Sequence, residues 1–214
     1  MKKKILVACL CVALAVLTIA GTTLAYLTST DKVENTFTVG NVAITLDEAA
    51  VNPDGTLKYK EDGVTPVDRV DNNSYKLMPG LTYTKDPIIH VAAGSENCYL
   101  FVTVKNEIAN IEATGNTTVA KQMEAKGWVA VAGQQNLYVY VGTAAGATAP
   151  AVVTKSTNVT VFEQIVIADT VTNDTLANYA NKTIVVNAYA VQKAGFENLT
   201  AAQIWTKAGF GTNS

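Results

Sequence analysis

Residues 97–104 read Asn-Cys-Tyr-Leu-Phe-Val-Thr-Val, and this stretch decides the fold class. Strand side chains alternate between two faces, so four small or apolar residues share one face of a predicted strand: Cys98, Leu100, Val102 and Val104. The strand is expected to continue to Ile108. A second segment rich in Val, Ile and Tyr, residues 82–92, precedes it across Ala93-Gly-Ser-Glu. The two segments are therefore expected either to pair as a hairpin or to cross between two sheets.

Other segments show the same strand character and are separated by turn signals. They are residues 36–46, with a bend at Gly40, and residues 128–132, 136–141, 159–168 and 184–191. Residues 184–191 are almost wholly apolar, which predicts a central strand covered on both faces. About eight strands with few helices and no βαβ rhythm favour an all-β, two-sheet sandwich with jelly-roll character.

Helices and turns complete this prediction. Residues 117–126 combine helix formers and stop at Gly127, while Thr200 and Gln203 have the spacing of a capping box that opens a second helix. One helical turn is expected within residues 169–181. Met78-Pro-Gly predicts a type II turn. Residues 47–73 contain several Pro, Gly and Asn-Asn turn signals and are expected to form an exposed insertion.

The first 25 residues have the features of an export signal. Three lysines, residues 2–4, precede the apolar run Ile5 to Ala20, and Thr23-Leu24-Ala25 is a small-x-small cleavage site. Cleavage is expected between Ala25 and Tyr26, leaving residues 26–214 as one domain. The alternative is a membrane anchor, but the run has 16 residues, fewer than the roughly 20 that a spanning helix needs.

The residues around this junction resemble the TasA/camelysin group of bacterial surface proteins, whose precursors are cut by the signal peptidase SipW. The group shares a pattern of alternating positions that this chain matches with Asn35, Phe37, Gly40, Val42, Ile44 and Leu46. A second similar stretch is Leu77-Met-Pro-Gly-Leu-Thr-Tyr-Thr-Lys-Asp, where Leu81 replaces a usual acidic residue. The closing Tyr189-Ala-Val-Gln with Gly195-Phe is also similar. The resemblance implies a jelly-roll core and a subunit of biofilm-matrix fibres.

Charge and cysteine content exclude several classes of function. Without the signal, 13 Lys and Arg remain against 18 Asp and Glu, a net charge of −5. This acidic balance offers no basic stripe for nucleic acid. Cys98 is the one cysteine left, so it has no partner for an internal disulfide, and its place on a strand face predicts a buried thiol. Intermolecular pairing is the alternative.

The sequence contains no recognisable catalytic constellation, cofactor motif or metal site. His90 is the only histidine and lies in a predicted strand, where a packing or hydrogen-bonding role is expected. A His-Glu-x-x-His zinc site needs two histidines, so the metalloprotease activity described for camelysin finds no ligand set here. Asp68, Asp71, Asn72 and Asn73 lack the spacing of a calcium loop. Lys and Asn are plentiful, but no isopeptide cross-link can be assigned. We expect no enzyme activity.

A structural or binding role remains, and two hypotheses follow. In the first, the new terminus Tyr26 to Val39 is donated as a strand to a copy of the chain or a sibling subunit, building fibres. The candidate donor residues are Tyr26, Leu27, Val33, Phe37 and Val39. The same stretch could instead be the first strand of a monomer. In the second hypothesis, the chain is a secreted binding module or adhesin that uses residues 47–73 and the Tyr138/Tyr140 face.

Both hypotheses imply the same processing and the same location. A SipW-like signal peptidase is the expected processing partner, and the membrane is met only during export. The protein is then expected outside the cell, on the surface or in the biofilm matrix of a Gram-positive-type bacterium.

Overall fold

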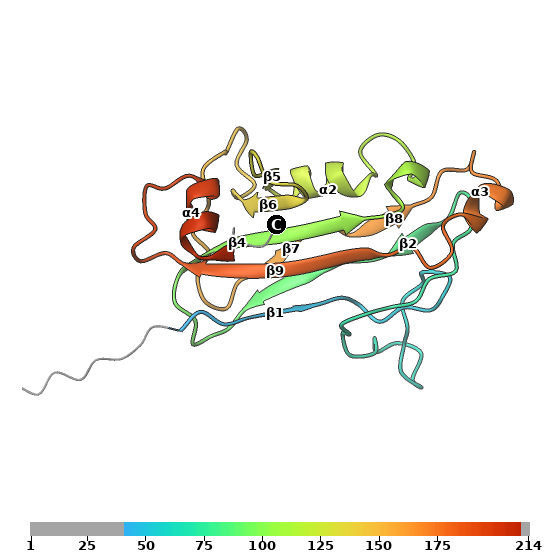
Figure 1. The fold of residues 1–214 in the computed structure, drawn as a ribbon. Coiled ribbons are helices and arrows are strands. Elements are labelled where there is room, and N and C mark those ends of the chain that lie inside the picture. Colours follow the sequence, from blue (N-terminus) through green and yellow to red (C-terminus); the bar gives the residue numbers. More distant parts are fainter. Residues whose placement is uncertain (1–40, 211–214) are drawn as a thin grey trace, which may run out of the picture. The chain divides into compact units, whose positions relative to one another are not determined.

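The computed structural model describes residues 41–210, which consist mainly of antiparallel strands (Figure 1). The strands are β1 (Ile44–Asp47), β2 (Thr82–Thr84), β3 (Ile88–Val91), β4 (Cys98–Asn106), β5 (Trp128–Ala130), β6 (Leu137–Tyr140), β7 (Asn158–Thr160), β8 (Gln164–Val166) and β9 (Ile184–Gln192). The helices are η1 (Ala109–Ile111, a 3-10 turn), α2 (Val119–Ala125), α3 (Asn173–Ala177) and α4 (Ala201–Lys207). Among the described residues, no helix is long and apolar enough to span a membrane.

The strands form two layers, which confirms the predicted all-β sandwich. One sheet has the order β5-β6-β4-β9. The other layer consists of β1-β3-β7 and the pair β2-β8, which continues the β3-β7 ladder along the same two chain segments. Residues 82–92 thus lie in one layer and β4 in the other, so the connection between them crosses from sheet to sheet rather than forming a hairpin.

Pro87 explains why residues 82–92 form two short strands where the sequence predicted one. Proline has no N–H for the ladder, and the chain is interrupted between β2 and β3 at this residue. The opposite segment is interrupted at the same level, between β7 and β8. Two backbone bonds bridge the gap: Val161 N–H donates to the Pro87 carbonyl at 2.9 Å, and Lys85 N–H donates to the Glu163 carbonyl at 3.2 Å.

The main core lies between the layers and takes side chains from both. Tyr83, Ile89 and Ile165 contribute from one layer, while Leu100 and Val102 contribute from β4. Cys98 is fully buried in this core, on the strand face that the sequence predicted. Burial alone raises the pKa of its thiol to about 11, so the thiol stays protonated and unreactive at neutral pH.

A second core covers the outer face of the four-stranded sheet. Phe101 and Val139 meet Ile204 and Trp205 of α4 there, and the Phe101 and Trp205 rings are 5.5 Å apart. Strand β4 is consequently buried on both faces, with Phe101 on one side and Leu100 on the other. Strand β4 lies in the interior of this sheet, between β6 and β9, whereas the sequence assigned a central position to residues 184–191.

Local sequence signals set the helix ends, and the predicted stop at Gly127 and the predicted capping box at Thr200 are both confirmed. The Thr118 side chain caps α2, and the helix is followed by Gly127 at φ +86°. A side chain at Gly127 would also bring its Cβ within 2.3 Å of the Gly142 carbonyl oxygen, so this position requires glycine. Thr200 and Gln203 form the complete capping box of α4.

Candidate functional site

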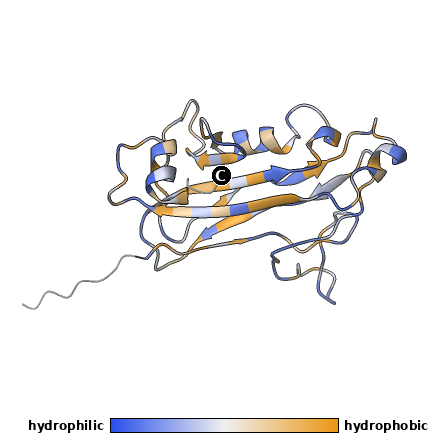
Figure 2. Cartoon of the chain, viewed as in Figure 1, coloured by the Kyte–Doolittle hydropathy of each residue, from blue (hydrophilic) through white to orange (hydrophobic). Residues whose placement is uncertain are grey.

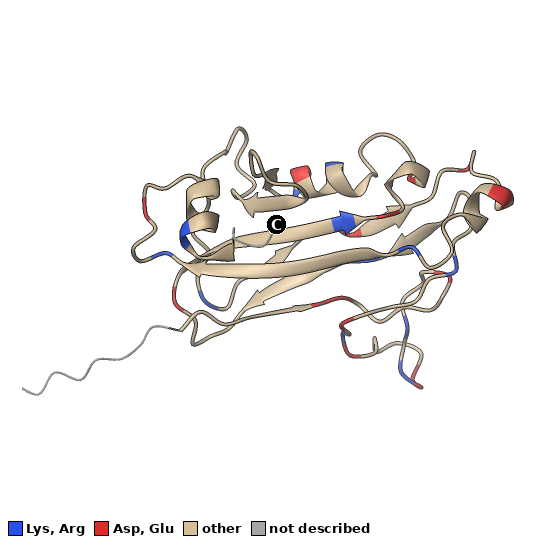
Figure 3. Ribbon diagram, viewed as in Figure 1, with Lys and Arg blue, Asp and Glu red and all other residues tan. Residues whose placement is uncertain are grey.

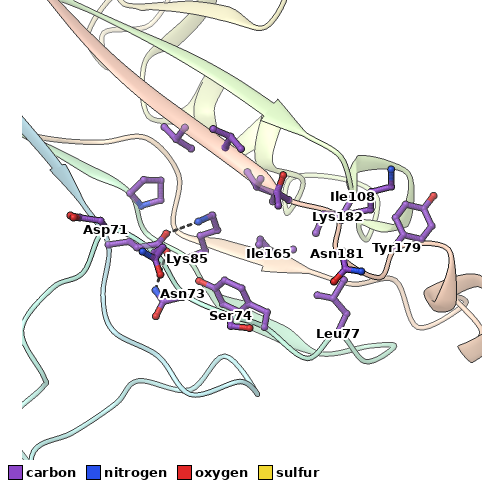
Figure 4. Close-up of a pocket in the computed structure, with 18 of the residues that line it drawn as sticks. Asp71, Asn73, Ser74, Leu77, Lys85, Ile108, Ile165, Tyr179, Asn181 and Lys182 are labelled. Carbon is purple, nitrogen blue, oxygen red and sulfur yellow. Dashed lines mark hydrogen bonds and ion pairs between the residues drawn. The ribbon is translucent and has the colours of Figure 1, made fainter.

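A pocket of about 750 Å³ lies between strands β1 and β9. Four segments line it, and we call it the β1–β9 groove (Figure 4). The lining residues come from positions 46–48 at the end of β1, 71–77 at and beyond the end of the insertion, 176–183 around the end of α3, and 184–186 of β9, together with Lys85, Pro87, Ile108 and Ile165.

Strands β1 and β9 are both edge strands among the described residues. Each pairs on one side, β1 with β3 and β9 with β4, and the two lie near each other without pairing. An edge strand keeps a row of backbone N–H and C=O groups without ladder partners. The groove is therefore bordered by two strands that could each accept another strand.

The apolar side chains of these edges are incompletely covered. Leu46 of β1 and Ile184, Val186, Ala188 and Ala190 of β9 contact the main core but are only half-buried. Figure 2 shows apolar residues along most of β9, and Figure 3 shows no charged residue on it. The sequence prediction of a central strand is thus wrong for β9: the strand lies at an edge of its sheet, although its two faces contact the two cores.

Three polar side chains meet at the end of the groove near β1. The Lys85 ammonium donates to Glu48 Oε2 at 2.6 Å, and the Asn73 amide donates to Glu48 Oε1 at 3.0 Å. Asn73 also donates to the Ala49 carbonyl at 2.8 Å and accepts from Val51 N–H at 3.0 Å. The Glu48 residue is 4% exposed and the Lys85 side chain 11%. The sequence did not predict this cluster, because its three residues lie far apart along the chain.

A second polar network anchors the insertion beside β1. Arg69 forms ion pairs with Asp47 and Asp86, and its guanidinium also donates to the backbone carbonyls of both. His90 bonds Asp47 through Nε2 at 3.0 Å and Asn158 through Nδ1 at 2.8 Å. The hydrogen-bonding role predicted for His90 is confirmed. Residues 56–66, further along the insertion, are exposed.

Stability should depend on pH through Asp47. Burial raises its pKa, but hydrogen bonds and charges from Arg69 and His90 outweigh this and hold the pKa below the ordinary 3.8. A lowered folded-state pKa contributes stability above the ordinary value, and this is lost as pH falls through the folded-state pKa. We expect Asp47→Asn to lose about 2 kcal/mol of unfolding free energy at neutral pH and progressively less as the pH falls below 3.8, measured by urea denaturation.

Asp68 provides the matched control for this prediction. Its side chain is 92% exposed and pairs with Lys60 at 3.1 Å. Exposed pairs of this kind contribute little, so Asp68→Asn should change the free energy by less than about 0.5 kcal/mol. An equal loss in both variants, or a loss for Asp47→Asn that persists at low pH, would contradict the assignment.

The aromatic face proposed for a binding module is less open than the sequence indicated. Tyr138 and Tyr140 are half-buried and pack against the main core, and the Tyr140 ring lies 5.3 Å from that of Trp128.

The predicted cleavage site and the candidate donor residues 26–39 lie outside the described residues.

The residues present do not fit a metal centre. Across residues 41–210, no three His, Cys, Asp or Glu side chains are grouped to hold a metal ion. His90 and Asp47 lie together, but Arg69 already binds that carboxylate and Asn158 occupies the other imidazole nitrogen. Of the acids and amides considered for calcium, Asp68 pairs with Lys60 and Asn73 with Glu48.

Comparison with known proteins gives one match. A family model described as camelysin metallo-endopeptidase matches residues 1–63, which confirms the resemblance to the TasA/camelysin group over that part. The comparison with curated proteins found no match, and neither did the comparison with solved structures.

Proposed function

We propose that this chain is an exported subunit of extracellular matrix or biofilm fibres. A SipW-like peptidase cuts between Ala25 and Tyr26, and the new terminus Tyr26 to Val39 enters the β1–β9 groove of the next subunit. The observation that carries this proposal is the position of β9: an uncharged, largely apolar strand lies at an edge, and its side chains toward the main core are only half-buried.

The groove and the donor are complementary in chemistry. An added strand bonds to edge N–H and C=O groups, while alternate side chains fill pockets along the groove. In an extended donor, Leu27, Val33, Phe37 and Val39 share one face because all are odd-numbered. That face would cover the half-buried rows of β1 and β9 and remove them from water.

Donation between copies gives a fibre because the contact does not close. The donor segment and the groove are different surfaces of the chain, so each subunit can give one strand and receive one. The family match supports this choice, because residues 1–63 include both the predicted cleavage site and the donor. A monomer results if the segment instead turns back into its own groove.

Deleting part of the donor tests the proposal directly. The full chain is exported with and without residues 28–36, which keeps the Ala25-Tyr26 junction intact. We expect filaments by electron microscopy from the unaltered chain and monomers from the deletion, because the groove is left unfilled. Removing the exposed tip of the insertion, residues 60–65, serves as the control and should leave filaments intact. If the donor deletion assembles like the unaltered chain, strand donation is wrong and the monomeric binding module is favoured.

A further inference from the structure

Glu48 binds an amine and a carboxamide that can react with each other, those of Lys85 and Asn73. One carboxylate oxygen accepts from Lys85 Nζ at 2.6 Å and the other from Asn73 Nδ2 at 3.0 Å, so the amine and the amide meet on one carboxyl group. Figure 4 shows Lys85 and Asn73 at the same end of the groove. We propose that Lys85 and Asn73 join in an intramolecular isopeptide bond and that Glu48 carries the protons. This inference is independent of strand donation.

The reaction needs no other reagent. Nζ attacks Asn73 Cγ, a new Nζ–Cγ bond forms, and the Cγ–Nδ2 bond breaks to release ammonia. Starting from the ion pair, Nζ loses two of its three protons. One converts the amide nitrogen to ammonia, and the other rests on Glu48 until the ammonia removes it as ammonium. Glu48 contacts both the nitrogen that loses protons and the nitrogen that gains one, as a general acid and base must.

The amide carbonyl is polarised for attack. Val51 N–H donates to Asn73 Oδ1 at 3.0 Å, so a backbone donor already faces the oxygen that becomes negative in the tetrahedral intermediate. The Ala49 carbonyl accepts from Nδ2 at 2.8 Å and fixes the plane of the amide. Asn73 is therefore held at both ends before the reaction starts, which lowers the entropic cost of reaching the transition state.

The reacting groups are shielded from water. Glu48 and the Lys85 side chain are almost wholly buried, and the Tyr75 ring centroid lies 5.9 Å from Nζ. Transfer of one proton from Nζ to Glu48 Oε2, two atoms that lie 2.6 Å apart, would neutralise both groups and leave the amine able to attack. Burial, followed by the negative charge of Glu48, raises the pKa of Tyr75 well above its ordinary value, so its hydroxyl stays neutral.

The bond would tie the insertion to the sandwich. Asn73 ends the insertion, whereas Lys85 lies between β2 and β3. A covalent link between them closes a loop within the unfolded chain and reduces its freedom. It would also fix one wall of the β1–β9 groove, since residues 71–77 line it.

Tryptic peptides of the secreted full-length protein decide the question. Trypsin cuts after Arg69 and Lys76, and a cross-linked Lys85 cannot be cut, so the bond joins residues 70–76 to residues 77–105. We expect this linked species by tandem mass spectrometry, lighter by one ammonia than the sum of its two peptides. A free peptide of residues 77–85 with no linked species would overturn the proposal.

Two variants and a control distinguish a loss of the reaction from a loss of folding. Glu48→Gln keeps the shape but not the proton carrier, and should slow bond formation about a hundredfold or more. Lys85→Arg keeps the positive charge, but a guanidinium is never deprotonated, so the linked species should be absent. Lys76→Arg changes an exposed lysine and should retain the bond. Ammonia loss that persists in Lys85→Arg would place the loss elsewhere and contradict the assignment.

Discussion

Replacing Val186 with lysine is expected to stop fibre assembly while the subunit remains folded. Val186 lies on β9, lines the β1–β9 groove and is half-buried against the main core. In the free subunit, a lysine stem can follow the groove and place its ammonium in water. A docked donor strand would cover that ammonium without supplying a partner. An uncompensated buried charge costs about 3 kcal/mol or more, so the dissociation constant should rise about a hundredfold.

Asn187→Lys is the matched control, because the next residue points to the opposite sheet face. Asn187 is exposed and donates to the Thr103 hydroxyl at 3.1 Å. A lysine there keeps its ammonium in water, whether or not a donor strand is bound. Filaments counted by electron microscopy and subunit size by sedimentation should distinguish the two variants, with circular dichroism confirming that both fold. Equal assembly of both variants would show that this groove receives no strand.

Replacing Trp205 with alanine is expected to give the largest loss of stability. Trp205 of α4 is 6% exposed and contacts three rings: Phe101 at 5.5 Å, Tyr189 at 5.0 Å and Phe210 at 4.9 Å between centroids. Truncating a buried aromatic residue removes its apolar contacts and leaves a cavity, at a cost of about 3–5 kcal/mol. Urea denaturation should show that loss as a lower midpoint.

Thr206→Ala tests whether the effect belongs to the second core. Thr206 is the next residue on the same helix but is exposed. Thr206→Ala should therefore change the free energy of unfolding by no more than about 0.5 kcal/mol. A small effect for Trp205→Ala would mean that α4 is not needed to cover the outer face of the four-stranded sheet. The prediction concerns the subunit alone and does not depend on assembly.

Local signals in the sequence correctly predicted local structure. Gly127 follows α2, and Thr200 with Gln203 forms the capping box of α4, because capping depends on residues within one helical turn. Alternation along β4 likewise predicted that Cys98 would be buried. The exception was the strand that Pro87 divides, where a single residue without an N–H outweighs the β-branched residues around it.

The polar cluster could not be predicted from the sequence. Asn73 follows Glu48 by 25 positions and Lys85 follows it by 37. Each of the three is an ordinary residue in its own segment. They meet because the insertion returns to β1 through the Glu48–Val70 bridge, while β2 and β3 bring Lys85 to the same place. Only the folded chain brings these three common residues into an arrangement in which they can react.

The sequence by itself determined most of the strands, the capping box of α4 and the all-β class, because these follow from the alternation of side chains and from contacts between near neighbours. Only the tertiary structure decided where each strand lies in its sheet. Residues 184–191 are apolar enough for a central strand, yet β4 takes that place and β9 lies at the edge beside the groove. The amino-acid composition of a strand indicates how much burial it favours. Strand order, however, depends on pairing between distant segments of the chain.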